Sequence, residues 1–213
     1  MEAPPHARYL LFLKAPRPGL VKTRLAAALG EEEACRVYRR LVDRLLAGLP
    51  EGFPLELHFS PADGESEMRE WLGDRFPLVP QIVSGLGERL EYAVGRAFRR
   101  GAEQVFCIGG DCPGLGMGQL RAASERLSAG ADLALGPCED GGYYLIGMRR
   151  FYPELFRGIP WSSSETLRAT LDRAKPLGLE VARLETLFDV DTIEDWRRLC
   201  EAEAARQRES GSK

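Results

Sequence analysis

The sequence predicts one α/β domain of three layers, with helices on both faces of a mostly parallel sheet. Short apolar runs alternate with helical patterns over all 213 residues, and no linker-like change of composition divides them. The run at 105–108 is apolar throughout and rich in β-branched and aromatic residues, which is typical of a strand buried on both faces. We therefore expect a single domain over 1–213, with a frayed polar tail at 207–213.

The same periodicities predict the individual elements. Apolar runs indicate strands at 8–13, 55–59, 78–83, 105–108, 132–135, 143–146 and 180–184. Apolar residues at helical spacing indicate helices at 31–46, 65–72, 86–98, 119–127, 165–174 and a last one that ends near Arg206. Alternation within 55–59 predicts a strand with one wetter face and an exposed His58. Ser162 with Glu165, and Thr192 with Asp195, have capping-box spacing.

Composition excludes several classes of function. The net charge of −3 gives no reason to expect nucleic acid or an anionic membrane as a partner. The apolar runs are far shorter than a membrane span, and the first residues lack the pattern of a signal peptide, so we expect a cytoplasmic location. The five cysteines form no CxxC pair, which argues against a disulfide framework and a cysteine-rich zinc site. Cys112 and Cys138 fall in candidate functional loops, where either could be a reactive thiol.

The first candidate site is a basic loop after the first strand. Residues 14–24 read Lys-Ala-Pro-Arg-Pro-Gly-Leu-Val-Lys-Thr-Arg, and the prolines and glycine fix the shape of this loop. Lys14, Arg17, Lys22 and Arg24 give it positive charge, which favours a phosphate site over a merely solvated loop. The loop fits neither the Walker pattern nor the GxGxxG fingerprint, so it is not that of a P-loop NTPase or a Rossmann dehydrogenase.

The second candidate is the end of the buried run. Gly109, Gly110 and Asp111 follow it, which places a carboxylate at the carboxyl end of a central strand, where ligands bind in open α/β sheets. Gly110 would let a large ligand approach the backbone. Asp111 could instead only cap a turn, and the local pattern does not decide between the two.

Two more acidic segments follow. Asp140 precedes Gly141-Gly142, which a plain hairpin would also use but which frees the backbone for close approach to a sugar or base. Asp189 and Asp191 lie two apart on an extended segment and therefore point to the same side.

Other positions at strand-to-helix junctions are less specific. Gly85 lies in a turn on the expected ligand side, and Arg89 could reach a ligand or pair with the neighbouring Glu88 or Glu91. Trp161 is either a core plug or a stacking platform. Together with the basic loop, the acidic segments provide the carboxylates and cations that a metal–diphosphate site requires, with Mg²⁺ or Mn²⁺ as the metal.

Six segments, taken in order, resemble a known family. The segments are 12–25, 86–90, Ile-Gly-Gly-Asp-Cys-Pro at 108–113, Gly-Pro-Cys-Glu-Asp-Gly-Gly-Tyr-Tyr-Leu-Ile-Gly at 136–147, 159–162 and 189–192. They resemble the bacterial DUF2064 group of nucleotide-diphospho-sugar transferase-like glycosyltransferases, which includes arsenosugar-biosynthesis glycosyltransferases. The resemblance covers Tyr9 to about Leu199, and Gly110 departs from it, since relatives often have Thr there.

The resemblance implies a GT-A, or nucleotide-diphospho-sugar transferase, fold. It also implies that Lys14, Lys22 and Arg24 bind the nucleotide and its phosphates, and that Asp111, with Asp189 or Asp191, holds Mg²⁺ or Mn²⁺. From the residues themselves we add Thr23, Gly85, Arg89 and Gly110 as nucleotide contacts, Gly141, Gly142 and Trp161 as substrate contacts, and Asp140 as the catalytic base.

Three functions stay open. A glycosyltransferase would take a nucleotide-diphospho-sugar and a small-molecule acceptor, whose hydroxyl Asp140 would deprotonate. A nucleotidyltransferase would couple an NTP to a phosphorylated small molecule without a base, and a lone Asp111 completed by a distant Asp-x-Asp is closer to this pattern. A nucleotide-binding module without turnover is least favoured, because the acidic set is intact. The identities of base, sugar and acceptor and the oligomeric state are not predicted.

Overall fold

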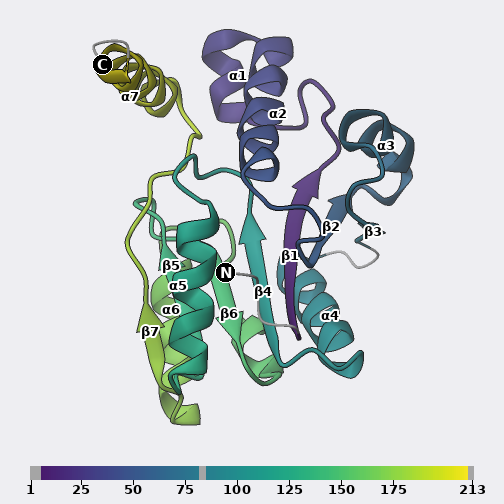
Figure 1. Ribbon diagram of the computed structural model, residues 1–213, viewed down its shortest axis with the longest axis vertical. Coiled ribbons are helices and arrows are strands. Elements are labelled where there is room, and N and C mark those ends of the chain that lie inside the picture. Colours follow the sequence, from purple (N-terminus) through teal and green to yellow (C-terminus); the bar gives the residue numbers. More distant parts are fainter. Residues whose placement is uncertain (1–5, 82–84, 211–213) are drawn as a thin grey trace.

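Seven strands form one sheet in the computed structural model, which describes residues 6–81 and 85–210 (Figure 1). The order across the sheet is β3-β2-β1-β4-β6-β5-β7. The strands are β1 Ala7–Lys14, β2 Leu55–Ser60, β3 Leu78–Pro80, β4 Gln104–Gly109, β5 Leu133–Pro137, β6 Tyr143–Met148 and β7 Val181–Arg183. β6 runs antiparallel to β4 and β5, and the other pairings are parallel. The predicted single domain with a mostly parallel sheet is confirmed.

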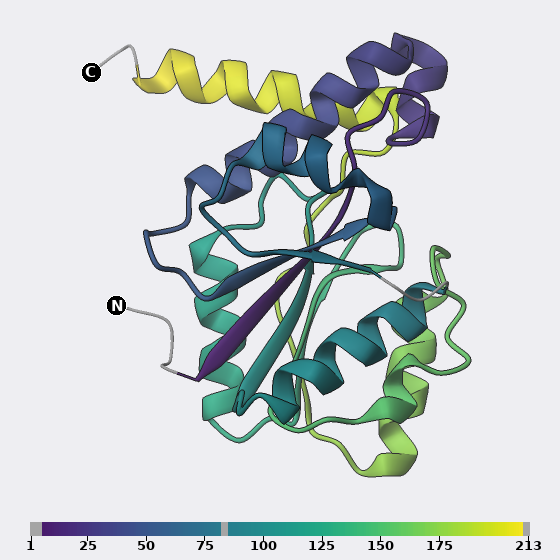
Figure 2. The ribbon, with the colours of Figure 1, turned by 90° about the vertical axis from the view of Figure 1, so that its right-hand side faces the viewer.

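Helices cover both faces of this sheet (Figure 2). The helices are α1 Thr23–Leu29, α2 Glu31–Ala47, α3 Glu65–Leu72, α4 Leu86–Arg99, α5 Met117–Ser128, α6 Thr166–Ala174 and α7 Ile193–Ser210, with 3₁₀ turns at Ala62–Gly64, Pro153–Phe156 and Lys175–Leu177. One apolar cluster packs α2, α3 and α5 on one face, and a second packs α4 and α6 on the other. Successive side chains of β1 pack into different clusters, because they point to opposite faces of the sheet. Tyr9 and Leu11 belong to the first cluster and Leu10 to the second.

A third apolar cluster joins α1, α2 and α7 at one end of the sheet. In Figure 2, α7 (yellow) lies beside α2, and Glu203 of α7 pairs with Arg40 and Arg44 of α2. Among the described residues no helix has the length and apolar character needed to cross a membrane.

The helix boundaries show two differences from expectation. α7 continues to Ser210, so its predicted end near Arg206 is too early, and 207–210 are helical rather than part of a tail. α1 begins at Thr23, inside the segment expected to be loop. Residues 82 and 83 of the predicted third strand lie outside the described residues, and β3 ends at Pro80.

The prediction that His58 is exposed is wrong, because its side of the sheet is covered. The residue is 3% exposed. Its ring stacks on Phe12 with 5.1 Å between centroids, and its Nε2 lies 3.3 Å from a carboxylate oxygen of Glu56. Arg96 of α4 also pairs with Glu56 (3.4 Å), so the ion pair of Arg96 and Glu56 lies where solvent was expected.

One of the two predicted capping boxes is present. The Asp195 carboxylate accepts hydrogen bonds from the Thr192 N–H (2.8 Å) and hydroxyl (2.7 Å), and the Asp195 N–H points back to that hydroxyl (3.3 Å). The box of Ser162 with Glu165 is wrong. Ser162 has a left-handed backbone (φ 60°), and it is the Ser163 hydroxyl that accepts the Glu165 N–H (3.3 Å).

Candidate functional site

The predicted loops meet in a cavity of about 300 Å³ beyond the carboxyl ends of β1, β4 and β5. Its lining includes Arg24 and four aspartates: Asp111, Asp140, Asp189 and Asp191. It also includes apolar and aromatic side chains, among them Phe12, Leu86, Leu90, Ile146, Tyr143 and Trp161. The lining thus combines residues suited to charged groups with residues suited to an apolar or planar group.

The segment before α7 carries two of these aspartates into the cavity through backbone hydrogen bonds. Leu187 N–H donates to Pro137 O (3.0 Å), and Val190 N–H donates to Asp111 O (3.1 Å). The Val190 side chain is fully buried in the cluster of α1, α2 and α7. Asp189 and Asp191, on either side of Val190, both line the cavity, as the predicted alternation requires.

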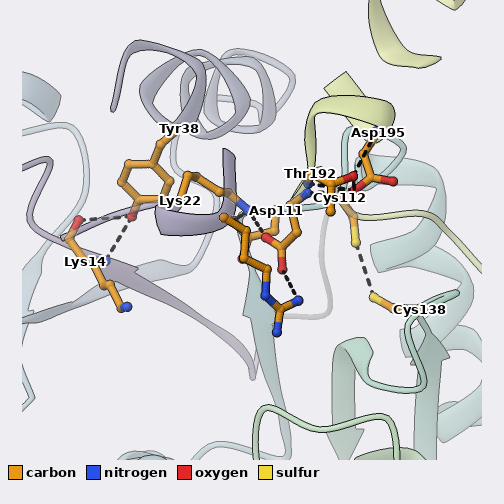
Figure 3. Close-up of polar contacts among 10 residues, drawn as sticks. Lys14, Lys22, Tyr38, Asp111, Cys112, Cys138, Thr192 and Asp195 are labelled. Carbon is orange, nitrogen blue, oxygen red and sulfur yellow. Dashed lines mark hydrogen bonds and ion pairs between the residues drawn. The ribbon is translucent and has the colours of Figure 1, made fainter. Parts of the chain in front are cut away.

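Lys22 lies between two carboxylates (Figure 3). Its Nζ is 2.6 Å from Asp111 Oδ1 and 2.8 Å from Asp191 Oδ1, and the side chain is 4% exposed. Burial lowers the pKa of Lys22, but the two carboxylates outweigh burial and the net pKa is raised. The backbone of Lys22 is left-handed (φ 48°), a conformation that costs a non-glycine residue on the order of 1 kcal/mol. The strained backbone and the buried charge both show that the fold fixes this ammonium between the aspartates.

Two of the four aspartates belong to a second group, with Cys138. Ligand atoms of Cys138, Asp140 and Asp189 are all within 4.8 Å of one another. Burial, followed by the charges of Asp140 and Asp191, raises the pKa of Asp189 to about 6. In the described part of the chain, no Lys or Arg side chain is within salt-bridge distance of Asp140 or Asp189. Asp140 accepts only the nearby Gly142 N–H (2.8 Å) among the hydrogen bonds found there.

Sequence reasoning missed a contact between two thiols at this acidic group. Cys112 Sγ lies 3.4 Å from Cys138 Sγ (Figure 3). The contact with Cys138, followed by burial and the surrounding negative charge, raises the pKa of Cys112. The two cysteines are 26 residues apart, so no local spacing motif could have paired them.

Several other predicted site residues lie away from the cavity lining. Lys14 and Thr23 are exposed, and the backbone N–H and C=O of Lys14 are bonded to the Tyr38 hydroxyl of α2 (2.9 and 3.0 Å). Gly85 caps α4. Arg89 donates to the Gln81 side chain (3.3 Å). Their predicted contacts with a nucleotide stay predictions.

The glycines at the site have a packing role. A Cβ on Gly110 would lie 3.0 Å from Val42 Cγ2, so this glycine lets β4 pack against α2. Gly141 has φ 88°, and a Cβ there would lie 2.2 Å from Ser164 O. The Asp-Gly-Gly turn therefore connects the β5–β6 hairpin and also presses against the segment before α6. The turn is thus a hairpin connection, and the predicted close approach of a sugar or base to its backbone stays a prediction.

Trp161 is a wall of the cavity and a packing residue at once. Its ring meets Tyr143 edge-on with 6.2 Å between centroids. A Cβ on Gly87 would lie 2.5 Å from Trp161 Nε1, so α4 approaches the indole closely. Leu86 and Leu90 line the cavity although their helical spacing predicted only a core face, because α4 turns that face toward the site at its first turn.

Comparison with known proteins gives the family. Residues 47–163 match the family model described as an uncharacterised protein conserved in bacteria (DUF2064). A crystal structure from Desulfovibrio desulfuricans G20, of a protein assigned as a nucleotide-diphospho-sugar transferase, is 35% identical, with 93% of this chain and 87% of that chain covered and a TM-score of 0.86. The chain belongs to the DUF2064 family. The predicted family is confirmed, and the predicted transferase class agrees with the assignment of this relative.

More distant structures share the fold. Rv0371c from Mycobacterium tuberculosis H37Rv, in complex with manganese, is 20% identical over 92% of this chain and 98% of that one, with a TM-score of 0.57. The inositol-1-phosphate CTP transferase from T. maritima is 16% identical over 89% and 91%, with a TM-score of 0.53. A search of curated proteins found no significant match.

Proposed function

We propose that this member of the DUF2064 family is a metal-dependent glycosyltransferase that uses a nucleotide-diphospho-sugar donor. The observation that carries the proposal is that four aspartates and Arg24 line one cavity together with aromatic side chains, and that Lys22 is bound to two of these aspartates. Such a lining offers charged groups for a diphosphate and apolar groups for a base or sugar ring. The 35% identical relative, itself assigned as a nucleotide-diphospho-sugar transferase, supports the same function.

The aspartates that line the cavity fit a hard divalent cation. Carboxylate oxygens are the ligands that Mg²⁺ and Mn²⁺ prefer, and the proposed ligands are Asp111, Asp189 and Asp191. When bound, such a cation supplies charge neutralisation for the diphosphate of the leaving group. The Lys22 ammonium, which lies between Asp111 and Asp191, shows that this part of the cavity stabilises positive charge.

The cationic side chains have separate tasks in this proposal. Lys22 is buried and fixed, so it orients Asp111 and Asp191 and stabilises negative charge that builds up next to them. Arg24 is 71% exposed at the edge of the same group, 3.7 Å from Asp191, where it can turn toward an incoming phosphate.

Asp140 is the proposed general base. Its carboxylate is exposed to the cavity and oriented by the Gly142 N–H. It has no cationic partner among the described side chains, so it can accept a proton from an acceptor hydroxyl without first breaking a salt bridge.

A nucleotidyltransferase is the second candidate, and one observation favours it. The acidic set is assembled from separate segments, with Asp111 and Asp191 80 residues apart, and not from adjacent aspartates. This arrangement suits an NTP held by Lys22 and Arg24, with no need for a base. A cytoplasmic location belongs to either proposal, because the five cysteines are free thiols, and the cytosol keeps thiols reduced.

Product analysis separates the two reactions. The purified protein is incubated with Mn²⁺ and either nucleotide-diphospho-sugars or NTPs, together with candidate acceptors. Release of nucleoside diphosphate from a sugar donor supports the glycosyltransferase, whereas pyrophosphate from an NTP supports the nucleotidyltransferase. A nucleotide-dependent rise in Tm without either product would leave only a binding module.

A further inference from the structure

Two sets of metal-ligating side chains share Cys138: the pair Cys112–Cys138, and the group of Cys138, Asp140 and Asp189. The two sulfur atoms are 3.4 Å apart, and the Cys138, Asp140 and Asp189 ligand atoms lie within 4.8 Å of one another. Across a tetrahedral zinc with Zn–S bonds of about 2.3 Å, two sulfurs lie about 3.8 Å apart. The thiol pair therefore needs little movement to bind one such ion.

The negative charge around the two thiols favours a bound metal cation, with both thiols deprotonated, over the metal-free state in which both are protonated. Asp140 and Asp189 have no salt-bridge partner among residues 6–81 and 85–210, whereas Lys22 already serves Asp111 and Asp191. Cys112 is 6% exposed and faces Cys138, with negative charge from Asp189 and Asp111 around it. A divalent cation would relieve the repulsion between the two carboxylates and stabilise two thiolates in the same step.

The ligand types select the class of metal. Two sulfurs and two carboxylate oxygens suit a thiophilic ion such as Zn²⁺, whereas Mg²⁺ takes oxygen ligands almost exclusively. We propose that Cys112, Cys138, Asp140 and Asp189 bind a thiophilic divalent cation at a site distinct from Lys22, Asp111 and Asp191. Binding deprotonates both thiols, so each Zn²⁺ that enters releases two protons from sulfur.

This site would compete with the proposed reaction, and that consequence rests on the proposed function. Zinc would occupy Asp140, the proposed base, and Asp189, a proposed ligand of Mg²⁺ or Mn²⁺. The protein would then be inhibited by Zn²⁺, and Cys138→Ser would relieve the inhibition.

Cobalt provides a direct test that does not depend on activity. Reduced, chelator-treated protein is titrated with Co²⁺, and we expect a near-ultraviolet band from thiolate-to-cobalt charge transfer that one equivalent of Zn²⁺ removes. Cys138→Ser and Cys112→Ser should each lower the intensity of the band and weaken Zn²⁺ binding on the order of 100-fold, since a hydroxyl replaces one of the two thiolates, and the double variant should abolish the band. Cys200→Ser, a thiol of α7 outside the group, is the matched control and should keep the band.

A second measurement uses the unaltered protein, in case a cysteine variant fails to fold. Zn²⁺ should protect two of the five thiols from alkylation, and peptide mapping should identify them as Cys112 and Cys138. The proposal is overturned if no charge-transfer band forms, if other cysteines are protected, or if the two thiols are found joined as a disulfide that binds no metal. Asp111→Asn should keep the band, so failure of the proposed function and failure of this site can be told apart.

Discussion

Asp111 and Asp191 share the buried ammonium of Lys22, whereas Asp140 and Asp189 line the same cavity without a salt-bridge partner in the part of the chain that the structure describes. The first pair is oriented and partly neutralised by Lys22. In the second pair, burial and then the charges of Asp140 and Asp191 raise the pKa of Asp189 to about 6. The four aspartates therefore differ in their electrostatic surroundings. Asp111 and Asp191 already have a cationic partner, whereas Asp140 and Asp189 are the pair available to bind a ligand, a proton or a metal ion.

Removal of the proposed base should have the largest effect on rate. We expect Asp140→Asn to lower kcat about 10²–10⁴-fold, the usual contribution of general-base catalysis, with little change in the Tm shift by nucleotide. Asp172→Asn, an exposed carboxylate of α6, is the control and should leave kcat unchanged. Full activity of Asp140→Asn would favour the nucleotidyltransferase, which needs no base.

The Lys22-bound pair is tested by binding instead of rate. Wild-type protein with donor nucleotide at about 100 times its Kd and Mn²⁺ should gain about 2.7 kcal/mol of stability. Asp111→Asn should lose the metal-dependent part of this gain, because a neutral amide is a poor ligand for Mn²⁺. Thermal shift with and without Mn²⁺ measures it, and an unchanged shift would remove Asp111 from the metal site.

Lys22 itself should contribute to stability as well as function. Lys22→Met leaves two carboxylates facing each other without their cation, and we expect a loss of about 1–2 kcal/mol, below the cost for a fully buried pair since both aspartates are partly exposed. Urea denaturation measures the free energy of unfolding. Lys14→Met changes an exposed lysine of the same loop and should alter it by less than about 0.5 kcal/mol.

The unpaired carboxylates should show in the pH dependence of stability. The pKa of Asp189 is higher in the folded protein, about 6, than the ordinary 3.8, so folding favours its protonated form and stability falls as pH rises through this range. Asp189→Asn removes this loss, and we expect its Tm to exceed that of wild type by roughly 2–4 °C at pH 8 without divalent ions. Below about pH 3, where Asp189 is protonated in both states, the difference should vanish. A constant difference at all pH values would show that ionisation of Asp189 is not its cause.

Local patterns predicted much of the fold and the chain segments of the site. The buried run at 105–108 is β4, and the Asp189/Asp191 alternation holds because Val190 is buried between them. The sequence could not predict what depends on packing between distant segments. His58 is buried because its ring stacks on Phe12 and Arg96 of α4 pairs with the neighbouring Glu56. The Cys112–Cys138 contact exists because the turn after β5 meets the loop after β4.

The Lys22 bridge was beyond prediction for the same reason. The basic loop was expected to bind phosphate, and nothing local shows that its lysine meets Asp111 and Asp191, 89 and 169 residues further along the chain. Long-range ion pairs depend on the folded geometry rather than on sequence spacing.

The segment at 187–191 has a consequence for synthesis on the ribosome. It supplies Asp189 and Asp191, and it is held by backbone bonds to Pro137 and Asp111 and by the packing of α7 on α1 and α2. A nascent chain that has emerged only to about residue 185 already contains all seven strands but neither aspartate. We therefore expect its sheet to form before its acidic site, and the nascent protein to bind no metal–nucleotide until this last segment has left the exit tunnel.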